Sequence, residues 1–289
     1  MQNERFFDQA QAMIEQGHVS VAVPMIAGKL YAAQANSETW QRTRQSLHQH
    51  PLHAMLLEDP YVAHCFRKPR GYAGDAKLID YIYDQVPPTP VSERGKTMFL
   101  TTTAFQASEG VRLRRDHAEQ VVGAAHDAGK SICVLACGHF REGDQLIGKD
   151  LSQVTLVDQD ELSLELVRLN HGYSANIVEA NVLKYLRGVA RSGECFDLIY
   201  TLGLTDYLDD RAMRLLHKLM KACLNPGGTM LLANFVPDHL AVGWMDAVMD
   251  WQLIYRDEAD LARYAGEIGM KAKTWRDPSG SIAWCEMMD

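Results

Sequence analysis

The sequence predicts an α/β fold in which an all-helical N-terminal domain precedes a mostly parallel sheet that ends in an antiparallel hairpin. Three observations support this fold class. Up to about residue 129, apolar residues recur at helical spacing and no series of strands appears. From residue 131, short apolar runs rich in β-formers alternate with amphipathic helical segments. Residues 270–288 then form two strand-like runs around the turn sequence "DPSG".

The N-terminal part is predicted to be helical throughout. The run "GDAKLIDYIYDQ" places Leu78 and Ile82 on one side of an amphipathic helix. The segment "VPPTPVSERG" at 86–95 follows, and its three prolines force extended backbone, so we expect a linker there. Beyond the linker we expect two more helices, over about 92–106 and 109–126.

Five buried strands are predicted from residue 131 onward. Their sequences are "SICVLAC", "VTLVD", "ANIVEA", "FDLIYTL" and "GTMLLANF". Each run is apolar on both of its faces, as in strands of a parallel sheet that helices cover on both sides. Helical segments such as "DDRAMRLLHKLMKAC" supply the right-handed crossovers. We expect the helical domain, a lid or substrate domain, to occupy residues 1–115 and the sheet domain to occupy 116–289.

Composition argues against several classes of protein. The chain has 289 residues and a formal net charge of −8, so we expect no nucleic-acid partner. No apolar run is long enough for a membrane span, and the start "MQNERFFDQAQ" has no apolar signal core. The six cysteines form no CxxC pair, which favours a cytoplasmic protein with reduced thiols.

Glycines and polar residues follow the predicted strands, where ligands bind in open α/β sheets. Gly138 follows the first strand and lets the backbone approach a ligand. Asp158 ends the second strand, twenty positions later, at the spacing of a carboxylate that binds ribose hydroxyls. Asn181 follows the third strand and can contact an adenine edge, while Thr201 and Gly203 follow the fourth. Strand-end Asp and Asn residues are also good helix caps, and that alternative stays open.

The remaining members of the predicted cofactor-binding set lie in the same loops: Ala136, Arg141, Gln159 and Val182. We also expect an α-helix to begin soon after Gly138 and to direct its free N–H groups toward the ligand. In the alternative to a ligand contact, Arg141 and Glu142 form a local pair at the start of that helix.

Because these residues follow successive predicted strands at these separations, the region 131–289 resembles the class I S-adenosylmethionine-dependent methyltransferases, which have a Rossmann-like sheet. "LNPGGTMLLANF" is similar to the fifth-strand motif of that family, and "SIAWCEMM" is similar to its last strand. The resemblance implies S-adenosyl-L-methionine as the cofactor, with Gly138 in the first glycine motif, Asp158 on the ribose and Asn181 at the adenine. The sequence departs from the family at Ala136, where an acid usually stands.

The combination of "RGYAGDAKLIDYIY" with "ACGHFREGD" resembles a bacterial subgroup that carries a helical N-terminal domain. This subgroup includes proteins assigned to 3-hydroxypalmitate methyl ester biosynthesis, which implies a small-molecule acceptor such as a carboxylate or hydroxyl of a lipid-like or secondary metabolite. A related branch contains azetidine-2-carboxylate synthases, which close the aminobutyryl chain of the same cofactor into a ring. A homodimer is compatible with either branch.

Four residues form the predicted catalytic set: Tyr72, Asp75, His139 and Tyr207. Tyr72 offers a hydroxyl or an aromatic face to a sulfonium. His139 would act as the base, because imidazole titrates near neutrality, and the alternative is a loop histidine satisfied by the backbone. Asp75 could hold a substrate amine or cap a helix. For ring closure, Tyr72, Tyr207 and Asp206 could hold the cofactor's chain bent.

Two other clusters are expected to be structural. His48, His50 and His53 in "HQHPLH" lie close together, but a proline interrupts them and no acid or cysteine is adjacent, so we expect no metal site. Trp244 and Trp251 are seven residues apart in a helical run. We expect them to form core or lid contacts rather than a binding cage.

Three functions stay open from the sequence. The first is methyl transfer to a small molecule, for which Arg67 or Arg70 could orient an anionic acceptor. The second is ring closure of the cofactor to azetidine-2-carboxylate and methylthioadenosine. The third is a non-catalytic regulatory protein that only binds the cofactor, as the irregular first motif suggests. An NAD-binding sheet is disfavoured because GxGxxG is absent.

Overall fold

The computed structural model describes residues 2–172 and 174–288 and divides into two compact units. The helical unit comprises Met1–Arg112 together with Asp238–Leu253, and the sheet unit comprises Leu113–Pro237 together with Ile254–Asp289. The sequence placed a single boundary at 115/116. The structure also assigns the segment 238–253, which lies far along the chain, to the helical unit.

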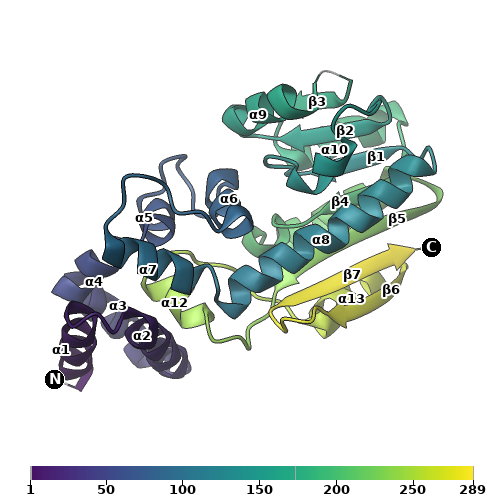
Figure 1. The fold of residues 1–289 in the computed structure, drawn as a ribbon. Helices are drawn as coiled ribbons and strands as arrows, with labels where there is room; N and C mark the ends of the chain where they lie inside the picture. Colours follow the sequence, from purple (N-terminus) through teal and green to yellow (C-terminus); the bar gives the residue numbers. More distant parts are fainter. Residues whose placement is uncertain (1, 173, 289) are drawn as a thin grey trace. The chain divides into compact units, whose positions relative to one another are not determined.

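The helical unit is built from short helices, and α8 (Gln106–Asp127) begins in it and ends in the sheet unit (Figure 1). The other helices of this unit are α1 (Gln2–Glu15), α2 (Val19–Gln34), α3 (Ser37–Gln49), α4 (Pro51–Leu56), α5 (Pro60–Arg67), α6 (Ala76–Asp84), α7 (Glu93–Thr102) and α12 (Val242–Ala247). The predicted linker 86–95 begins between α6 and α7, and its last three residues, 93–95, form the first turn of α7.

Side-chain caps start several of these helices. The Asn36 side chain accepts from Thr39 N at the start of α3, and Asp59 accepts from Tyr61 N at the start of α5, where Pro60 fills the first turn. These contacts satisfy N–H groups that have no partner within the helix.

The segment 238–253 is held to α3 and α4 through its backbone. The Nε2 atom of His48 lies 2.7 Å from the carbonyl oxygen of Ala247, and that of His53 lies 3.1 Å from the carbonyl oxygen of Val248. Two of the three clustered histidines therefore anchor main chain. No group of residues suited to a metal ion is found among the described residues.

Trp244 and Trp251 do not share one helix. Helix α12 ends at Ala247, and Asp250 has a left-handed backbone with φ of 49°, which redirects the chain before Trp251. Both indole side chains are buried. The predicted helical stripe is thus wrong, whereas the predicted packing role is confirmed.

In the sheet unit, the described residues form one seven-stranded sheet in the order β3-β2-β1-β4-β5-β7-β6 (Figure 1). Neighbouring strands from β3 to β5 are parallel, and β7 runs antiparallel to both β5 and β6. The strands are β1 (Ile132–Leu135), β2 (Val154–Asp158), β3 (Asn176–Glu179), β4 (Phe196–Thr201), β5 (Leu224–Phe235), β6 (Lys271–Arg276) and β7 (Ile282–Met288). The predicted fold class, a Rossmann-like sheet with a terminal hairpin, is confirmed.

Two predicted features of the sheet unit differ in the structure. Strand β5 begins at Leu224, because Leu224 pairs with Phe196 and the turn at 225–228 bulges out before pairing resumes between Leu198 and Thr229. Among the described residues, no α-helix lies between β1 and β2. The chain instead forms a short 3₁₀ helix, η1 (Arg141–Leu146), so the expected α-helix N-terminus beside Gly138 is absent.

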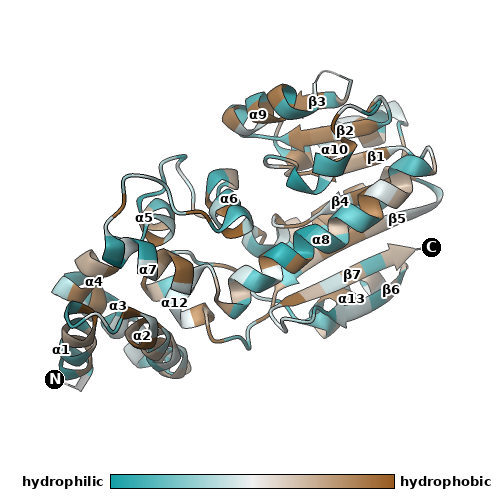
Figure 2. Cartoon of the chain, in the orientation of Figure 1, coloured by the Kyte–Doolittle hydropathy of each residue, from teal (hydrophilic) through white to brown (hydrophobic). Residues whose placement is uncertain are grey.

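Helices cover both faces of the sheet. One face packs against helices α10 (Val182–Ser192), α11 (Asp210–Ala222) and α13 (Glu258–Glu267) in a continuous apolar core. Helix α8 runs across the other face, where His117 contacts the Trp284 ring. Helix α9 (Glu161–His171) packs against β2 and β3. The inner strands are predominantly brown, that is hydrophobic, in Figure 2.

Within residues 2–172 and 174–288, no helix has both the length and the apolar character that a membrane span requires.

Gly243 provides a test of how closely 238–253 packs within the helical unit. A Cβ added at Gly243 would lie 2.6 Å from the carbonyl carbon of Leu30, whereas one added at Gly28 of the same helix α2 would meet nothing within 4 Å. Gly243→Ala should lower the free energy of unfolding by roughly 1–3 kcal/mol, because the added methyl group would force the backbone at Leu30 to move. Gly28→Ala is the control and should be neutral or slightly stabilising. Chemical denaturation measures both, and equal stabilities would contradict the packing.

The buried Asp59 makes stability depend on pH. Burial raises the pKa of this carboxyl to about 7, against hydrogen bonds from Thr102 Oγ1, Tyr61 N and Val62 N that lower it. The folded state therefore holds this proton more tightly than the unfolded chain, whose carboxyl has a pKa near 3.8. The protonated Asp59 carboxyl therefore adds to the free energy of unfolding. This added stability is complete below pH 4 and is lost as the pH rises through about 7.

Asp59→Asn should remove this decline while keeping the helix cap, because an amide oxygen also accepts from Tyr61 N. Thermal melts between pH 4 and 8 should show a smaller loss of stability on raising the pH than in the wild type, by up to roughly 4 kcal/mol. The exposed Glu165→Gln serves as the control. Parallel pH profiles for wild type and Asp59→Asn would show that Asp59 does not hold a proton in the folded state.

Candidate functional site

The strand order places a candidate ligand site in the sheet unit, at the carboxyl ends of β1 and β4. Strand β1 lies between β2 and β4, so the chain leaves β1 in one direction along the sheet and returns on its other side. Connections diverge at such a switch point and leave a crevice outside the strand ends. The predicted residues after β1, β2 and β4 all belong to this edge.

The loop after β1 has an unusual backbone. Ala136, Gly138 and Phe140 all have positive φ, of 55°, 52° and 51°. Only glycine adopts this region freely, so the two non-glycine residues store some strain, as is typical of functional loops. Phe140 is fixed by close packing on Gly143, where an added Cβ would lie 2.1 Å from Cε1 of the Phe140 ring.

Asp158 ties this loop to the loop that follows β2. Its Oδ2 accepts from Gly138 N at 2.8 Å, and its Oδ1 accepts from Asp160 N at 2.9 Å. The residue is 7% exposed. Burial raises its pKa above the ordinary value, although the backbone N–H groups of Asp160, Gly138 and Gln159 oppose that rise. A carboxylate has about four lone-pair sites, so these three donors leave one that can accept from a hydroxyl donor.

Asp160, not Asp158, caps the next helix. The side chain of Asp160 accepts from Leu162 N at 3.1 Å and from Ser163 Oγ at 2.8 Å at the start of α9. The alternative that Asp158 is only a helix cap is therefore wrong. The predicted neighbour Gln159 is exposed between the two acids.

Asn181 does cap a helix. Its side-chain oxygen accepts from Lys184 N at 3.2 Å at the start of α10. The capping alternative noted from the sequence is therefore confirmed. The amide nitrogen and the second lone pair of the oxygen are still able to contact an adenine edge. Val182, the next residue, is 7% exposed.

Thr201, at the end of β4, buries a hydroxyl that has no protein partner. The residue is fully buried, and among the described residues no group forms a hydrogen bond with its Oγ1. An unpaired buried hydroxyl costs free energy and calls for an explanation. A ligand atom at the strand end would supply one.

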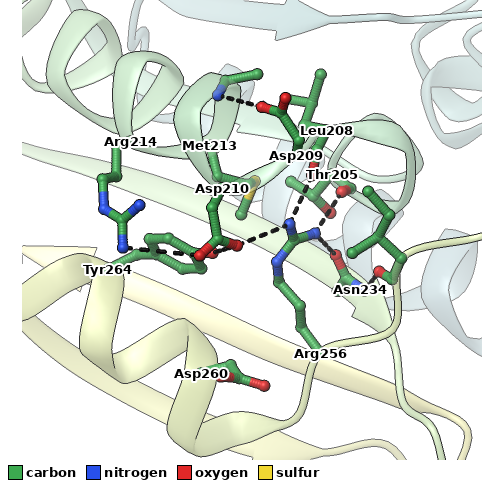
Figure 3. Close-up of polar contacts among 12 residues, drawn as sticks. Thr205, Leu208, Asp209, Asp210, Met213, Arg214, Asn234, Arg256, Asp260 and Tyr264 are labelled. Atoms are coloured by element: carbon green, nitrogen blue, oxygen red, sulfur yellow. Dashed lines mark hydrogen bonds and ion pairs between the residues drawn. The ribbon is translucent and has the colours of Figure 1, made fainter.

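Two buried arginines hold the backbone between β4 and α11. Arg256 donates to the carbonyl oxygens of Thr205 at 2.8 Å and Leu208 at 2.5 Å (Figure 3). Arg114 of α8 donates to the carbonyl oxygen of Leu202 at 2.7 Å, and Gly203 lies beside its guanidinium. Charge-assisted hydrogen bonds of this kind keep the loop in one conformation.

The predicted catalytic residues of the sheet unit differ in access. Tyr207, in η2 (Thr205–Tyr207), is 41% exposed. His139 is 4% exposed, within the turn after β1. Arg141 pairs with Asp144 at 3.0 Å.

The other two predicted catalytic residues belong to the helical unit. Asp75 is 1% exposed, caps α6 by accepting from Leu78 N, and lies 2.8 Å from Nε2 of His64. Burial raises its pKa, but the contacts with His64 and Leu78 N outweigh burial and the net pKa is lowered. Tyr72 is 37% exposed in the loop before α6.

Sequence reasoning named Asp206 as a candidate for holding the cofactor's chain bent, but it missed the burial of Glu142 and Arg114 on the α8 face of the sheet. Glu142 turns inward, and its Oε1 accepts from the Tyr200 hydroxyl at 2.8 Å. Burial raises the pKa of Glu142, and it raises the pKa of Asp206 to about 6 against the opposing charge of Arg114. Only the surplus of charged residues around a predicted strand end could have pointed to them. The thiol of Cys137, by contrast, has a pKa that burial raises, which suits packing rather than nucleophilic attack.

No protein-family model and no curated protein matches this chain. A solved structure from Bordetella parapertussis, described as a possible exported protein, aligns over 94% of this chain and 96% of its own, with 15% identity and a TM-score of 0.56. That similarity concerns the fold of the whole chain.

Methyltransferases also occur among the similar structures. An O-methyltransferase family protein from Burkholderia thailandensis has 16% identity and a TM-score of 0.49, over 68% of this chain and 59% of its own. Magnesium protoporphyrin IX methyltransferase from Synechocystis PCC 6803, with bound SAH, has 14% identity and a TM-score of 0.47, over 74% and 99%. Scores of this size assign neither an activity nor a ligand to this chain.

The unpaired hydroxyl of Thr201 can be tested by a matched pair of substitutions. Thr201→Val removes a buried group without a partner and should raise the free energy of unfolding by roughly 1 kcal/mol. Thr205→Val removes a hydroxyl that donates to the carbonyl oxygen of Ala233 at 2.5 Å, and should lower it by roughly 1–3 kcal/mol. Chemical denaturation without ligand measures both. Destabilisation by Thr201→Val would mean that its hydroxyl is satisfied.

Proposed function

We propose that the sheet unit binds S-adenosylmethionine at the carboxyl ends of its strands, and that the protein transfers the methyl group to a small-molecule acceptor. The observation that carries the proposal is the buried carboxylate of Asp158, which joins the loops after β1 and β2 while Asp160 takes over the helix cap. A strand-end acid that is free of capping, beside a glycine turn, suits a ribose with two hydroxyl donors.

The residues present fit such a cofactor. Asp158 would accept the ribose hydroxyls, and the positive-φ glycine turn at Gly138 permits close approach of the backbone. The unpaired Thr201 hydroxyl and the amide of Asn181 offer further polar contacts. The motifs at 131–289 that resemble the class I methyltransferases favour the same ligand.

When bound, this cofactor supplies an electrophilic methyl group on a positively charged sulfur. Little acid–base chemistry is then required of the protein, and its task is to align the acceptor and to exclude water. Tyr207 is exposed on the loop that the two arginines hold and would contact the acceptor. The catalytic role expected for Tyr72, on the loop before α6, stays a prediction.

The acceptor class follows from the resemblance. A carboxylate or hydroxyl of a lipid-like or secondary metabolite suits a subgroup with a helical N-terminal domain. His139 is a weaker candidate for the base, because it is 4% exposed. A carboxylate acceptor would need no base, since it is already ionised at neutral pH.

Substitution at Asp158 tests the cofactor site. Asp158→Ala should weaken binding of S-adenosylhomocysteine by roughly 1–3 kcal/mol, about 5- to 150-fold, the scale of hydrogen bonds to a charged group. Asp160→Ala is the matched control: it removes the cap of α9 and should lower stability by about 1 kcal/mol while changing the affinity little. Calorimetry measures both. Equal affinities for wild type and Asp158→Ala would refute the ribose contact.

The products separate methyl transfer from ring closure and from binding alone. The protein is incubated with S-adenosylmethionine, with and without candidate carboxylic and hydroxylated acceptors, and the products are analysed by mass spectrometry. We expect S-adenosylhomocysteine to appear only when an acceptor is present. Methylthioadenosine together with a new amino acid would show ring closure instead. Binding without turnover of any acceptor would favour a regulatory protein.

A further inference from the structure

The last residue of α9, His171, is a buried histidine whose ring nitrogens have no hydrogen-bond partner. Its side chain is wholly buried, and among the described residues neither Nδ1 nor Nε2 makes a hydrogen bond. A neutral imidazole carries one donor and one acceptor, so both are left unsatisfied. A buried polar group in this state calls for an explanation.

The His171 ring packs on the loop that follows β1. Its centroid lies 5.1 Å from the centroid of the Phe140 ring, and the two planes are tilted by 54°. Phe140 has a left-handed backbone, and its N–H donates to the carbonyl oxygen of Cys137 at 2.9 Å. This hydrogen bond closes the turn that contains Gly138, so the position of Phe140 fixes the shape of that turn. His171 therefore acts on the glycine turn through an aromatic contact.

Asp144 faces His171 from η1. Its Oδ1 lies 3.6 Å from Nε2 of His171, beyond hydrogen-bond distance but close enough to attract a protonated ring. Its Oδ2 accepts from Nε of Arg141 at 3.0 Å. The carboxylate of Asp144 is thus shared between a permanent cation and a ring that becomes a cation only on protonation.

Protonation of His171 is disfavoured near neutral pH. Burial lowers the pKa of this residue below its ordinary value of 6.5, and the charge of Asp144 opposes burial only in part. A positive charge at this position would also be stabilised by the carbonyl end of α9. The ring is therefore neutral at pH 7.5 and takes up a proton as the pH falls below 6.5.

Of the charged groups on the elements in contact with His171, Asp144 is the one that acts on its pKa. The others are Arg141 and Glu142 of η1, Glu161, Glu165 and Arg168 of α9 itself, and Asp158 and Glu179 of strands β2 and β3, against which α9 packs.

We propose that His171 is a positioning residue for the candidate cofactor site: the neutral ring braces Phe140 and keeps the glycine turn in its binding shape, whereas the protonated ring pairs with Asp144 and releases the turn. This inference rests on the proposed function and adds a control by pH to it. Because the ligand binds the neutral form more tightly, its affinity is highest at neutral pH and falls as His171 takes up a proton. One linked proton limits this fall to about tenfold per pH unit.

Calorimetry on the full chain with S-adenosylhomocysteine, in steps between pH 8 and 5, tests the proposal. The wild type should bind about 3- to 30-fold more weakly at pH 5 than at pH 8. His171→Phe keeps a ring against Phe140 but cannot take up a proton, so most of this decline should disappear. Asp144→Asn removes the attraction on the protonated ring and should move the decline to lower pH.

His217→Phe is the matched control, because His217 is also a fully buried histidine that stacks on an aromatic ring, that of Tyr264. It should keep the decline of the wild type. A decline in His171→Phe as large as in the wild type would show that the histidine only fills space, and the proposal is overturned. Should His171→Phe fail to fold, Asp144→Asn decides: a decline at an unchanged pH would overturn the proposal.

Nuclear magnetic resonance of the ligand-free protein separates this inference from the proposed function. If the wild type binds S-adenosylhomocysteine at no pH, the proposed function fails, but the brace can still be measured. The ring signals of Phe140 should then change with pH at the same midpoint as the imidazole signals of His171. Phe140 signals that do not follow the protonation of His171 would overturn the brace.

Discussion

The hydrogen bonds of the Asp158 carboxylate to Gly138 N and Asp160 N set the shape of the candidate site. They join two loops that leave adjacent parallel strands, so the glycine turn and the acid occupy fixed positions relative to each other. Because Asp160 caps α9, the fold does not need Asp158 for local helix formation. A buried acid that is released from a structural role in this way is available for ligand binding, and burial strengthens every bond it makes.

The same edge of the sheet gathers charges that the core alone would not favour. Arg114 and Arg256 are both buried, and each donates to carbonyl oxygens between β4 and α11. Burying Glu142 and Asp206 beside Arg114 is costly unless a ligand completes the pairing. The structure thus combines a rigid loop with charges that are balanced only in part, an arrangement that favours a small, charged ligand over an extended partner.

Much of this architecture could be predicted from the sequence. Continuous apolar runs such as "VTLVD" identified the strands, and the "DPSG" turn identified the hairpin, because these patterns depend on local chemistry. The 3₁₀ helix after β1 could not be predicted, since it depends on the packing of Phe140 on Gly143. The inward turn of Glu142 toward Tyr200 was missed for a similar reason, because the two residues are 58 positions apart and meet only in the folded sheet. The spacing of Asp158 and Asn181 along the sequence also could not show whether each side chain caps a helix. In the structure Asn181 caps α10, whereas Asp158 does not cap α9.

The most direct test of the account is a crystal structure of the protein with S-adenosylhomocysteine. The account predicts that the ribose hydroxyls lie within hydrogen-bond distance of the Asp158 carboxylate. A ligand bound elsewhere, or a ribose turned away from Asp158 with its hydroxyls in solvent, would contradict the central claim.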